Sequence, residues 1–294
     1  MLNRIRTFAR SHKALSIAAL VLIVLIAATL IFHPHGTQTY LILGIDNYGL
    51  VSQSGRSDVM MLVQIDFDRR NISTVTFARD MLIPDHKGNM VKINTIVRSE
   101  SGGEDGLVSA LENAFGIEID GWFRVNFTSV ILLVDAIGGV EIELTADEVR
   151  YLNNHAGIYP DYPLSEGKSR LNGGQALSYA RCRALDNDMG RGQRQNKLMR
   201  AMVSSAGKMS IGRIGGVFNS LSGAWTSSLS GAQQAGLLSK VIWLRGASVT
   251  SIGVPFEGTY RYGSSGGTNG VVANIDSNRT LLRQALGLDP ISDE

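Results

Sequence analysis

The sequence has almost no capacity for covalent cross-linking, because Cys182 is the only cysteine among its 294 residues. An internal disulfide is therefore excluded, and the folded part must be stabilised by its apolar core. No histidine lies near Cys182 in the sequence to activate a thiolate. A small buried side chain is therefore favoured over a nucleophile.

Charge is also scarce. Only 18% of the residues are charged, and 28 Lys and Arg against 26 Asp and Glu give a net charge of +2. This charge is too small to indicate a nucleic-acid partner. The sequence has no internal repeat and no long charged block. Its basic N-terminal tail shows no helix-turn-helix pattern, so transcriptional regulation is poorly supported.

One long hydrophobic run is present, from Ala14 to Phe32, and it contains no charged residue. At ~1.5 Å per residue the run reaches roughly 28 Å, close to the ~30 Å hydrocarbon core of a bilayer. It is followed by His33-Pro34-His35 and not by a small-residue cleavage site. This context favours an uncleaved transmembrane helix, residues 14–32, over a cleaved signal peptide.

The charges beside this run predict its orientation. Residues 1–13 contain four basic residues and no acidic one, so the positive-inside rule places this basic tail in the cytoplasm. We therefore expect a single-pass protein of the cell membrane. Residues 33–39 would form a linker, and residues 40–294 would form an extracellular catalytic domain.

The rest of the sequence alternates between strand-like and helix-like segments. This interleaving predicts an α/β (α+β) domain in which helices cover a central mixed β-sheet in a layered sandwich. Glycine and serine are dense from Tyr262 to Gly270, which predicts a flexible loop. Periodicity predicts strands at 40–45, 58–67, 72–77, 122–127, 140–144 and 249–254, and helices at 104–115, 128–137, 146–154, 174–179, 193–208, 233–243 and 277–286.

Four of the fourteen residues from 181 to 194 are arginine and none is lysine. A planar guanidinium group binds two phosphate oxygens at once, so such a cluster suits pyrophosphate recognition. Taken alone, the more common explanation is a solvated face on which Asp186 and Asp188 form ion pairs with these arginines. The four are Arg181, Arg183, Arg191 and Arg194.

Further charged residues stand at the expected strand ends. Arg56-Ser57-Asp58 opens one strand, Arg79-Asp80 closes another, and Asp46 follows the first. Functional sites are commonly built at such positions. A carboxylate just past a buried strand suits Mg²⁺, which one or two carboxylates hold together with substrate phosphate oxygens and water. A turn-forming aspartate is the ordinary alternative.

These motifs follow one another in an order that resembles the LytR-CpsA-Psr family. The resemblance covers residues 40 to about 200 strongly and the remainder weakly, and the order is more specific than any single motif. The sequence departs from the usual family pattern at Ala78, where many members have proline, and at Gly174, where many have glutamate. The matching segments are Leu43-Gly44-Ile45-Asp46, residues 55–60, Phe77-Ala78-Arg79-Asp80, Lys92-Ile93-Asn94, residues 134–140, residues 171–183, Asp188-Met189-Gly190-Arg191 and Arg194-Gln195.

The resemblance implies a phosphotransferase that moves a glycan phosphate from a polyprenyl-pyrophosphate carrier to a hydroxyl of peptidoglycan. The polymer would be teichoic acid, capsule or a similar glycopolymer. The family's cofactor would be Mg²⁺, with Mn²⁺ as an alternative, bound by Asp46 and Asp58. The pyrophosphate would be bound by Arg56, Arg79, Arg181, Arg183, Arg191, Arg194 and Gln195. Catalytic roles would fall to Arg56, Arg79, Asp80, Asp188 and Arg191.

Several alternatives stay open at the level of sequence. The general base could be Asp80 or an aspartate on the metal. Water could replace the glycan acceptor, which would make the protein a polyprenyl-pyrophosphate phosphohydrolase. The arginines could instead bind anionic wall polymer without catalysis. An isoprenoid tail would need an apolar tunnel, which the helix at residues 131–134 could line, although core packing explains any single residue there.

Overall fold

In a computed structural model the chain divides into two units, Met1–Gly36 and Thr37–Glu294. The structure describes residues 34–45, 57–98, 102–155, 163–182, 184–185, 188–209 and 223–289. The expected transmembrane helix, residues 14–32, lies outside these ranges. Within them, no helix combines the length and the apolar character needed to cross a membrane.

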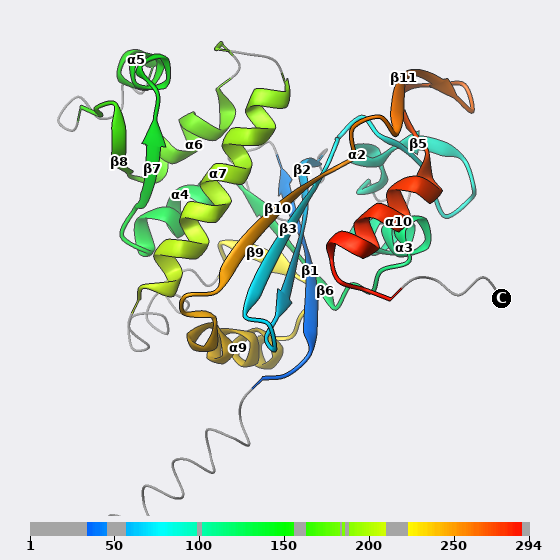
Figure 1. The fold of residues 1–294 in the computed structure, drawn as a ribbon, viewed down its shortest axis with the longest axis horizontal. Coiled ribbons are helices and arrows are strands. Elements are labelled where there is room, and N and C mark those ends of the chain that lie inside the picture. The colour runs from blue at the N-terminus through cyan, green and yellow to red at the C-terminus, as the bar shows by residue number, and fades with distance from the viewer. Residues whose placement is uncertain are drawn as a thin grey trace, which may run out of the picture. The chain divides into compact units, whose positions relative to one another are not determined.

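The second unit is built on a six-stranded sheet with the strand order β10-β3-β2-β1-β6-β9. Strands β1 and β2, and β2 and β3, pair in antiparallel fashion, whereas β1 pairs in parallel with β6 and β3 with β10. The predicted mixed sheet is therefore confirmed (Figure 1). The strands are β1 (Thr37–Ile45), β2 (Ser57–Asp66), β3 (Asn71–Phe77), β6 (Gly121–Asn126), β9 (Trp225–Ser227) and β10 (Ser248–Val254).

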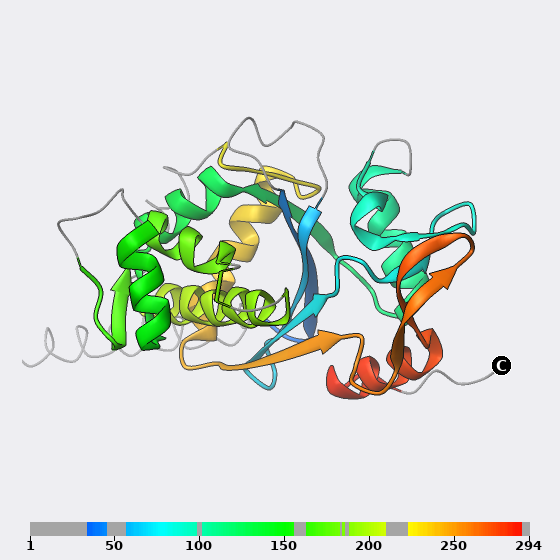
Figure 2. The same ribbon diagram turned by 90° about the horizontal axis from the view of Figure 1, so that it is seen from above.

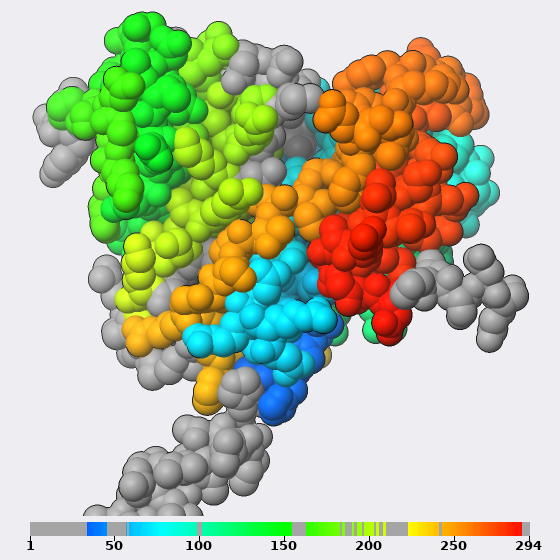
Figure 3. Space-filling view, viewed as in Figure 1, coloured from blue at the N-terminus to red at the C-terminus, as the bar shows by residue number. Residues whose placement is uncertain are grey.

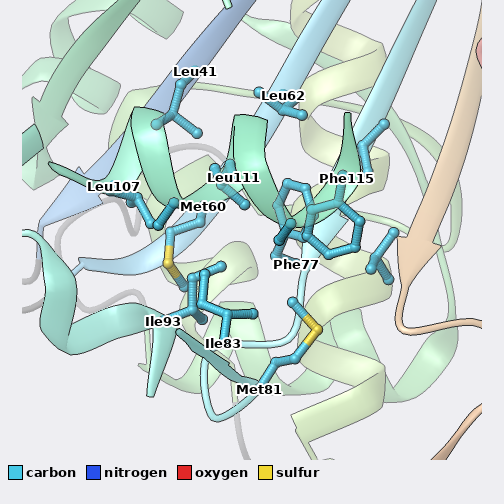
Figure 4. Packing of buried hydrophobic residues seen from close by; sticks show 14 of the residues in the cluster. Leu41, Met60, Leu62, Phe77, Met81, Ile83, Ile93, Leu107, Leu111 and Phe115 are labelled. Carbon is cyan, nitrogen blue, oxygen red and sulfur yellow. The ribbon is translucent and has the colours of Figure 1, made fainter. Parts of the chain in front are cut away.

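One face of the sheet packs against the larger apolar core. Because side chains alternate along a strand, Leu41 and Leu43 point to this face together with Met60 and Leu62. They meet apolar side chains of helix α3 such as Leu111 (Figure 4). The elements on this side are β4 (Leu82–Pro84), β5 (Met90–Lys92), α2 (Ile93–Ile96), α3 (Gly103–Phe115), β11 (Tyr260–Ser265), β12 (Thr268–Ala273) and α10 (Ile275–Ala285).

A second layer of helices covers the opposite face, and Figures 1 and 2 show the sheet between the two layers. A separate apolar cluster holds this layer together and includes Val134, Leu152, Tyr179 and Leu198. The elements are α4 (Phe127–Ala136), β7 (Val140–Leu144), α5 (Ala146–His155), β8 (Gly167–Leu171), α6 (Gly173–Arg181), α7 (Asp188–Gly207), α9 (Gly231–Lys240) and the 3₁₀ helix η2 (Val241–Leu244).

Two details of the sequence prediction are wrong. The sequence pattern predicts Thr128 as the cap of helix α4, but the cap is Asn126, whose side chain accepts a hydrogen bond from the Ser129 N–H at 2.9 Å. The segment expected to be a flexible loop is the antiparallel hairpin of β11 and β12. Its glycines Gly266 and Gly267 both have positive φ angles, of 56° and 79°. Such angles at both central positions are those of the two-residue turns that connect hairpin strands.

Helices α4 and α6 approach each other closely at Gly173. A Cβ atom added to Gly173 would lie 2.7 Å from the Cα of Ile131 and would overlap the Ile131 carbonyl. The obstruction is helix backbone, which cannot rotate away as a side chain can. Gly173 therefore sets the spacing between the two helices that lead to Phe127 and Arg181.

We expect Gly173→Ala to destabilise the second unit by about 1–3 kcal/mol, because the added methyl group must displace backbone. The matched control is Gly236→Ala in α9. Apart from its chain neighbours and the nearby backbone of its own helix, the new Cβ would meet no described atom within 4 Å. The control should leave stability unchanged or raise it by up to ~1 kcal/mol. Urea unfolding of the full chain in detergent gives both values. Equal midpoints would show that α4 and α6 are not in close contact.

Candidate phosphate site and apolar cavity

Four strands of the sheet run in one direction and end at the same edge. The pairings make β1, β3, β6 and β10 mutually parallel. We call their common end the C-terminal sheet edge, and it is defined by Ile45, Phe77, Asn126 and Val254. The predicted site residues come from segments that join the sheet here. Ligand sites of α/β proteins commonly lie outside the carboxyl ends of parallel strands.

A β-bulge marks this edge between β1 and β2. Gly44 pairs with Val59 and Ile45 pairs with Ser57, so Asp58 is the extra residue of the bulge. The Ser57 hydroxyl bridges it by donating to the Val59 carbonyl at 2.7 Å. Bulges are frequent beside active sites, where they redirect a side chain. The backbone therefore departs from the regular ladder at one of the two predicted metal ligands.

Arg79 and Asp80 follow β3 after the single residue Ala78, and the structure adds Lys92 to them. The Asp80 carboxylate lies 3.9 Å from Arg79 Nε and 3.6 Å from Lys92 Nζ. The Asn94 N–H donates to the Arg79 carbonyl at 3.3 Å, which ties the start of α2 to the same segment. One carboxylate is thus shared by two cations whose side chains are partly exposed. Lys92 was visible in the sequence only as part of a family motif.

Arg181 approaches the same edge from the helical layer. Its guanidinium carbon lies 4.1 Å from the centroid of the Phe127 ring, a cation–π contact. Phe127 directly follows β6, and the Asn126 cap fixes its backbone. From β3 to β6 is three strand spacings, roughly 14 Å. Two long side chains with a diphosphate between them can bridge this distance.

Arg194 has a different environment from Arg181. It is 5% exposed, and its Nη2 donates to the Cys182 carbonyl at 2.8 Å. It therefore anchors α7 to the end of α6. The predicted burial of Cys182 is confirmed, since that residue is 1% exposed. Gln195, the next residue of α7, lines the cavity described below.

Part of the predicted site is not described. Asp46, Arg56 and Arg183 lie outside the described residues. Asp58, Asp188 and Arg191 lie in described strands or helices, but their side chains do not belong to the described part. Among the described side chains, no group of three or more His, Cys, Asp or Glu could hold a metal ion. The metal assignment of Asp46 and Asp58 therefore stays a prediction.

An apolar cavity of about 620 Å³ lies on the helical face of the sheet. Alternate residues of β2, from Val59 to Ile65, line it, while Met60 and Leu62 between them face the opposite core. Helix α4 contributes Val130 and Leu133. Of the segment expected to line a tunnel, Leu133 does so, whereas Val134 packs in the helical core.

The cavity has two chemically different ends. Ile45, Val59 and Asn126 line it at the C-terminal sheet edge, where Arg181 of its wall contacts Phe127. Tyr40 and Ile65 line it about 20 Å away along the strands. Burial raises the pKa of the Tyr40 phenol, and the negative charge of Asp120 raises it further. Tyr40 therefore stays neutral at ordinary pH, and the far end carries no charge from it.

We expect Leu133→Trp to fill the cavity and weaken binding of an apolar fluorescent probe at least tenfold, because the indole occupies the space that the probe needs. The neighbouring Leu132 is 44% exposed and is not part of the cavity wall, so Leu132→Trp is the matched control. Titrating each full-length variant with the probe measures the difference. Equal losses in both variants would contradict the assignment of Leu133 to the cavity.

Together, the fold and the site define an α/β protein with an apolar cavity whose wall includes Arg181 and Gln195. The LytR-CpsA-Psr family model matches residues 7–279, and the chain therefore belongs to the LytR-CpsA-Psr family. The relative polyisoprenyl-teichoic acid–peptidoglycan teichoic acid transferase TagV of Bacillus subtilis (strain 168) is 31% identical over 170 residues. This alignment covers 55% of the chain but only 42% of TagV.

Solved structures share the fold. The structure "TagT bound to LIIa-WTA" superposes with a TM-score of 0.67 at 23% identity, covering 86% of this chain and 91% of that one. The family protein YwtF (TagT) with bound octaprenyl pyrophosphate lipid gives a TM-score of 0.62 at 22% identity, with the same two coverages of 86% and 91%. At such identities the structural similarity establishes the fold alone, and any function must be argued from the residues of the site.

Proposed function

We propose that this protein transfers a glycopolymer phosphate from a polyprenyl-pyrophosphate carrier to a hydroxyl of peptidoglycan. The observation that carries the proposal is the apolar cavity with Arg181 in its wall at the C-terminal sheet edge. An isoprenoid tail is apolar, and the pyrophosphate attached to it is anionic. A cavity of this polarity therefore suits both parts of one donor molecule.

The names of relatives agree with this proposal. TagV is named as a transferase that joins teichoic acid to peptidoglycan. The TagT structure that shares the fold contains an octaprenyl pyrophosphate lipid. Both the lipid class and the anionic polymer fit the cavity and the arginines of this chain. The full set of activities is a proposal here, because the chain aligns with less than half of TagV.

The arginines and Lys92 would neutralise the charge that the phosphate oxygens carry as the bond order changes. Phosphoryl transfer depends on this stabilisation and on positioning more than on covalent catalysis. The acceptor hydroxyl oxygen forms a bond to the phosphorus that carries the glycan. The bond from that phosphorus to the bridging oxygen breaks, and polyprenyl phosphate leaves with its electron pair. The hydroxyl proton passes to a base.

A divalent cation fits the donor chemistry of the two predicted ligands. Asp46 is covalently attached to Ile45, whose strand partner Ser57 precedes Asp58. Two carboxylates with phosphate oxygens and water are the usual ligand set for Mg²⁺, and Mn²⁺ accepts similar ligands. We propose that Asp46 and Asp58 hold this cation. When bound, it would add positive charge beside the diphosphate.

Residues 14–32 are proposed to anchor the protein in the cell membrane, with residues 1–13 in the cytoplasm and the folded unit outside. The proposal rests on the uncharged run and on the basic residues before it. Such an anchor would keep the domain near the bilayer, where a polyprenyl-linked donor resides. The acceptor peptidoglycan lies on the same outer side.

The central test incubates the full chain in detergent micelles with a polyprenyl-pyrophosphate-linked glycan, peptidoglycan and Mg²⁺. We expect phosphate-linked glycan on the peptidoglycan, and none after EDTA treatment. Arg181→Ala should lower the rate about 10²–10³-fold, because it removes a cation from the diphosphate. Lys168→Ala, an exposed change on β8, is the control and should leave the rate unchanged.

Other outcomes, in this experiment or in cells, would favour one of the alternative functions. Glycan phosphate released at the same rate without peptidoglycan would favour a phosphohydrolase. Wall-polymer attachment in cells that survives Asp46→Ala combined with Asp58→Ala would favour a non-catalytic binder of anionic polymer. Product formed equally well in EDTA would contradict the metal assignment.

A second prediction concerns Asp80, whose carboxylate lies between Arg79 and Lys92. We expect it to orient these cations and not to accept the hydroxyl proton, which leaves the base role to an aspartate at the metal. Asp80→Asn should then cost about two- to fivefold in rate, as expected for partly exposed ion pairs. The shape of the pH–rate profile should not change.

A general base would behave differently. Its loss typically costs 10²–10⁴-fold and removes the acidic limb of the pH–rate profile. Measuring rates of wild type and Asp80→Asn from acidic to neutral pH separates the two roles. A hundredfold loss with a flattened acidic limb would show that Asp80 is the base.

A further inference from the structure

The β11–β12 hairpin is attached directly to the Asp80 segment. The Val271 N–H of β12 donates to the Asp80 carbonyl at 2.9 Å, and Met81 and Val271 form a parallel bridge. Figure 2 shows the hairpin beside the β4–β5 region that contains Lys92. The hairpin is therefore part of the structure around the candidate phosphate site, although nothing in the sequence linked it to that site.

The hairpin is also held at its turn. A Cβ atom on Gly266 would lie 3.0 Å from Met90 Cβ, and the Thr268 hydroxyl donates to the Met90 carbonyl at 3.0 Å. Met90 begins β5, which ends at Lys92. Contacts of Thr268 and Val271 in β12 thus fix the hairpin relative to Asp80 and Lys92, so its outer strand β11 is a defined surface and not a mobile loop.

The outer strand presents an unusually exposed aromatic ring. Tyr262 is 78% exposed, more than any other large apolar side chain of the described residues. Its ring lies edge-on to that of Tyr260 at a centroid distance of 5.9 Å, which restricts its orientation. Tyr262 pairs with Val271, the residue bonded to Asp80. Two strand spacings, roughly 10 Å, therefore separate the backbones of Tyr262 and Asp80.

The surroundings of Tyr262 favour a carbohydrate over a lipid. Ser264 and its strand partner Asn269 are exposed, lie on the same face of the hairpin as Tyr262, and offer hydrogen-bonding groups beside the ring. Sugar rings have apolar C–H faces that pack on aromatic rings and hydroxyls that bond to such polar neighbours. Figure 3 shows the hairpin on the surface next to α10, with α7 on the other side of β10. It is thus separate from the cavity, whose wall includes side chains of α7.

We infer that Tyr262 binds a sugar ring of the acceptor glycan and so places an acceptor hydroxyl near the Asp80 edge. This inference rests on the proposed function and adds the acceptor subsite to it. The donor and the acceptor would then approach the phosphate site from different sides of the sheet. Tyr262 would act in acceptor binding and would not contact the donor.

The test measures binding of solubilised peptidoglycan glycan strands, freed of attached polymer, to the full chain in micelles. Tyr262→Ala should weaken binding about five- to tenfold, the effect expected for loss of one aromatic stacking partner. Tyr262→Phe keeps the ring and should bind within about twofold of wild type. Leu281→Ala, which changes a side chain on α10 that is 36% exposed, should match wild type.

Kinetics of the transfer reaction supply the second measurement. Tyr262→Ala should raise the KM for glycan strands by the same factor and leave the KM for the lipid-linked donor unchanged. Tyr262→Ala that binds glycan as tightly as wild type would overturn the inference. Failure of the wild-type protein to bind glycan would also overturn it. The same holds if Tyr262→Ala loses donor affinity equally, or if its only effect is a change of oligomeric state.

Failure of the proposed function would look different. If the wild-type protein binds glycan strands through Tyr262 but forms no phosphate-linked product, the glycan-binding surface is supported and the transferase function is contradicted. Conversely, if Tyr262→Ala transfers normally with an unchanged KM, the transferase function is supported and the acceptor subsite at Tyr262 is contradicted.

Discussion

The candidate site depends on one constraint, the shared direction of four strands. Because β1, β3, β6 and β10 are parallel, the segments that follow them leave the sheet at one edge. Residues that are far apart in the chain are thereby brought to neighbouring positions without a dedicated loop. Each strand pairing contributes about 4.8 Å of spacing. The strand spacings from β3 to β6 therefore determine the width of the site, and long cationic side chains are needed to span it.

The candidate site also requires that the helical layer be held at a fixed distance from the sheet. Helix α4 begins directly at the end of β6, where Asn126 and Ser129 cap each other. Gly173 allows α6 to pack against α4 without a gap, and α6 ends at Arg181 over the Phe127 ring. The same packing leaves the apolar face of β2 uncovered, which creates the cavity. One set of contacts thus positions the cation and leaves room for an apolar ligand.

Most of the strands and longer helices could be predicted from the sequence, because periodicity and turn residues act over short distances. Strand β7, Val140–Leu144, was located to the residue. The hairpin at 260–273 was missed because the same glycines suit a mobile loop and a tight turn, and only pairing distinguishes them. Asn126 and Thr128 are both good capping residue types, and the end of β6 at Asn126 makes Asn126 the cap of α4.

The residues of the site were harder to predict from the sequence than the strands and helices, because some of their roles depend on contacts across the fold. The arginines were found because a cluster of one residue type is visible along the chain. Lys92 and Phe127 have no such signal, since their roles arise from contacts with Asp80 and Arg181 across the fold. Tyr262 lies in a segment whose composition indicated no structure. Residues that act through tertiary contacts become visible only when the sheet and its two layers are assembled.

The two layers also separate the two substrates that the proposed reaction must join. Arg181 belongs to the layer that encloses the cavity, whereas Arg79, Lys92 and the hairpin belong to the layer of α3 and α10. A diphosphate bound at the edge would contact cations from both layers, while its apolar tail occupied the cavity. The opposite side then remains accessible to an acceptor.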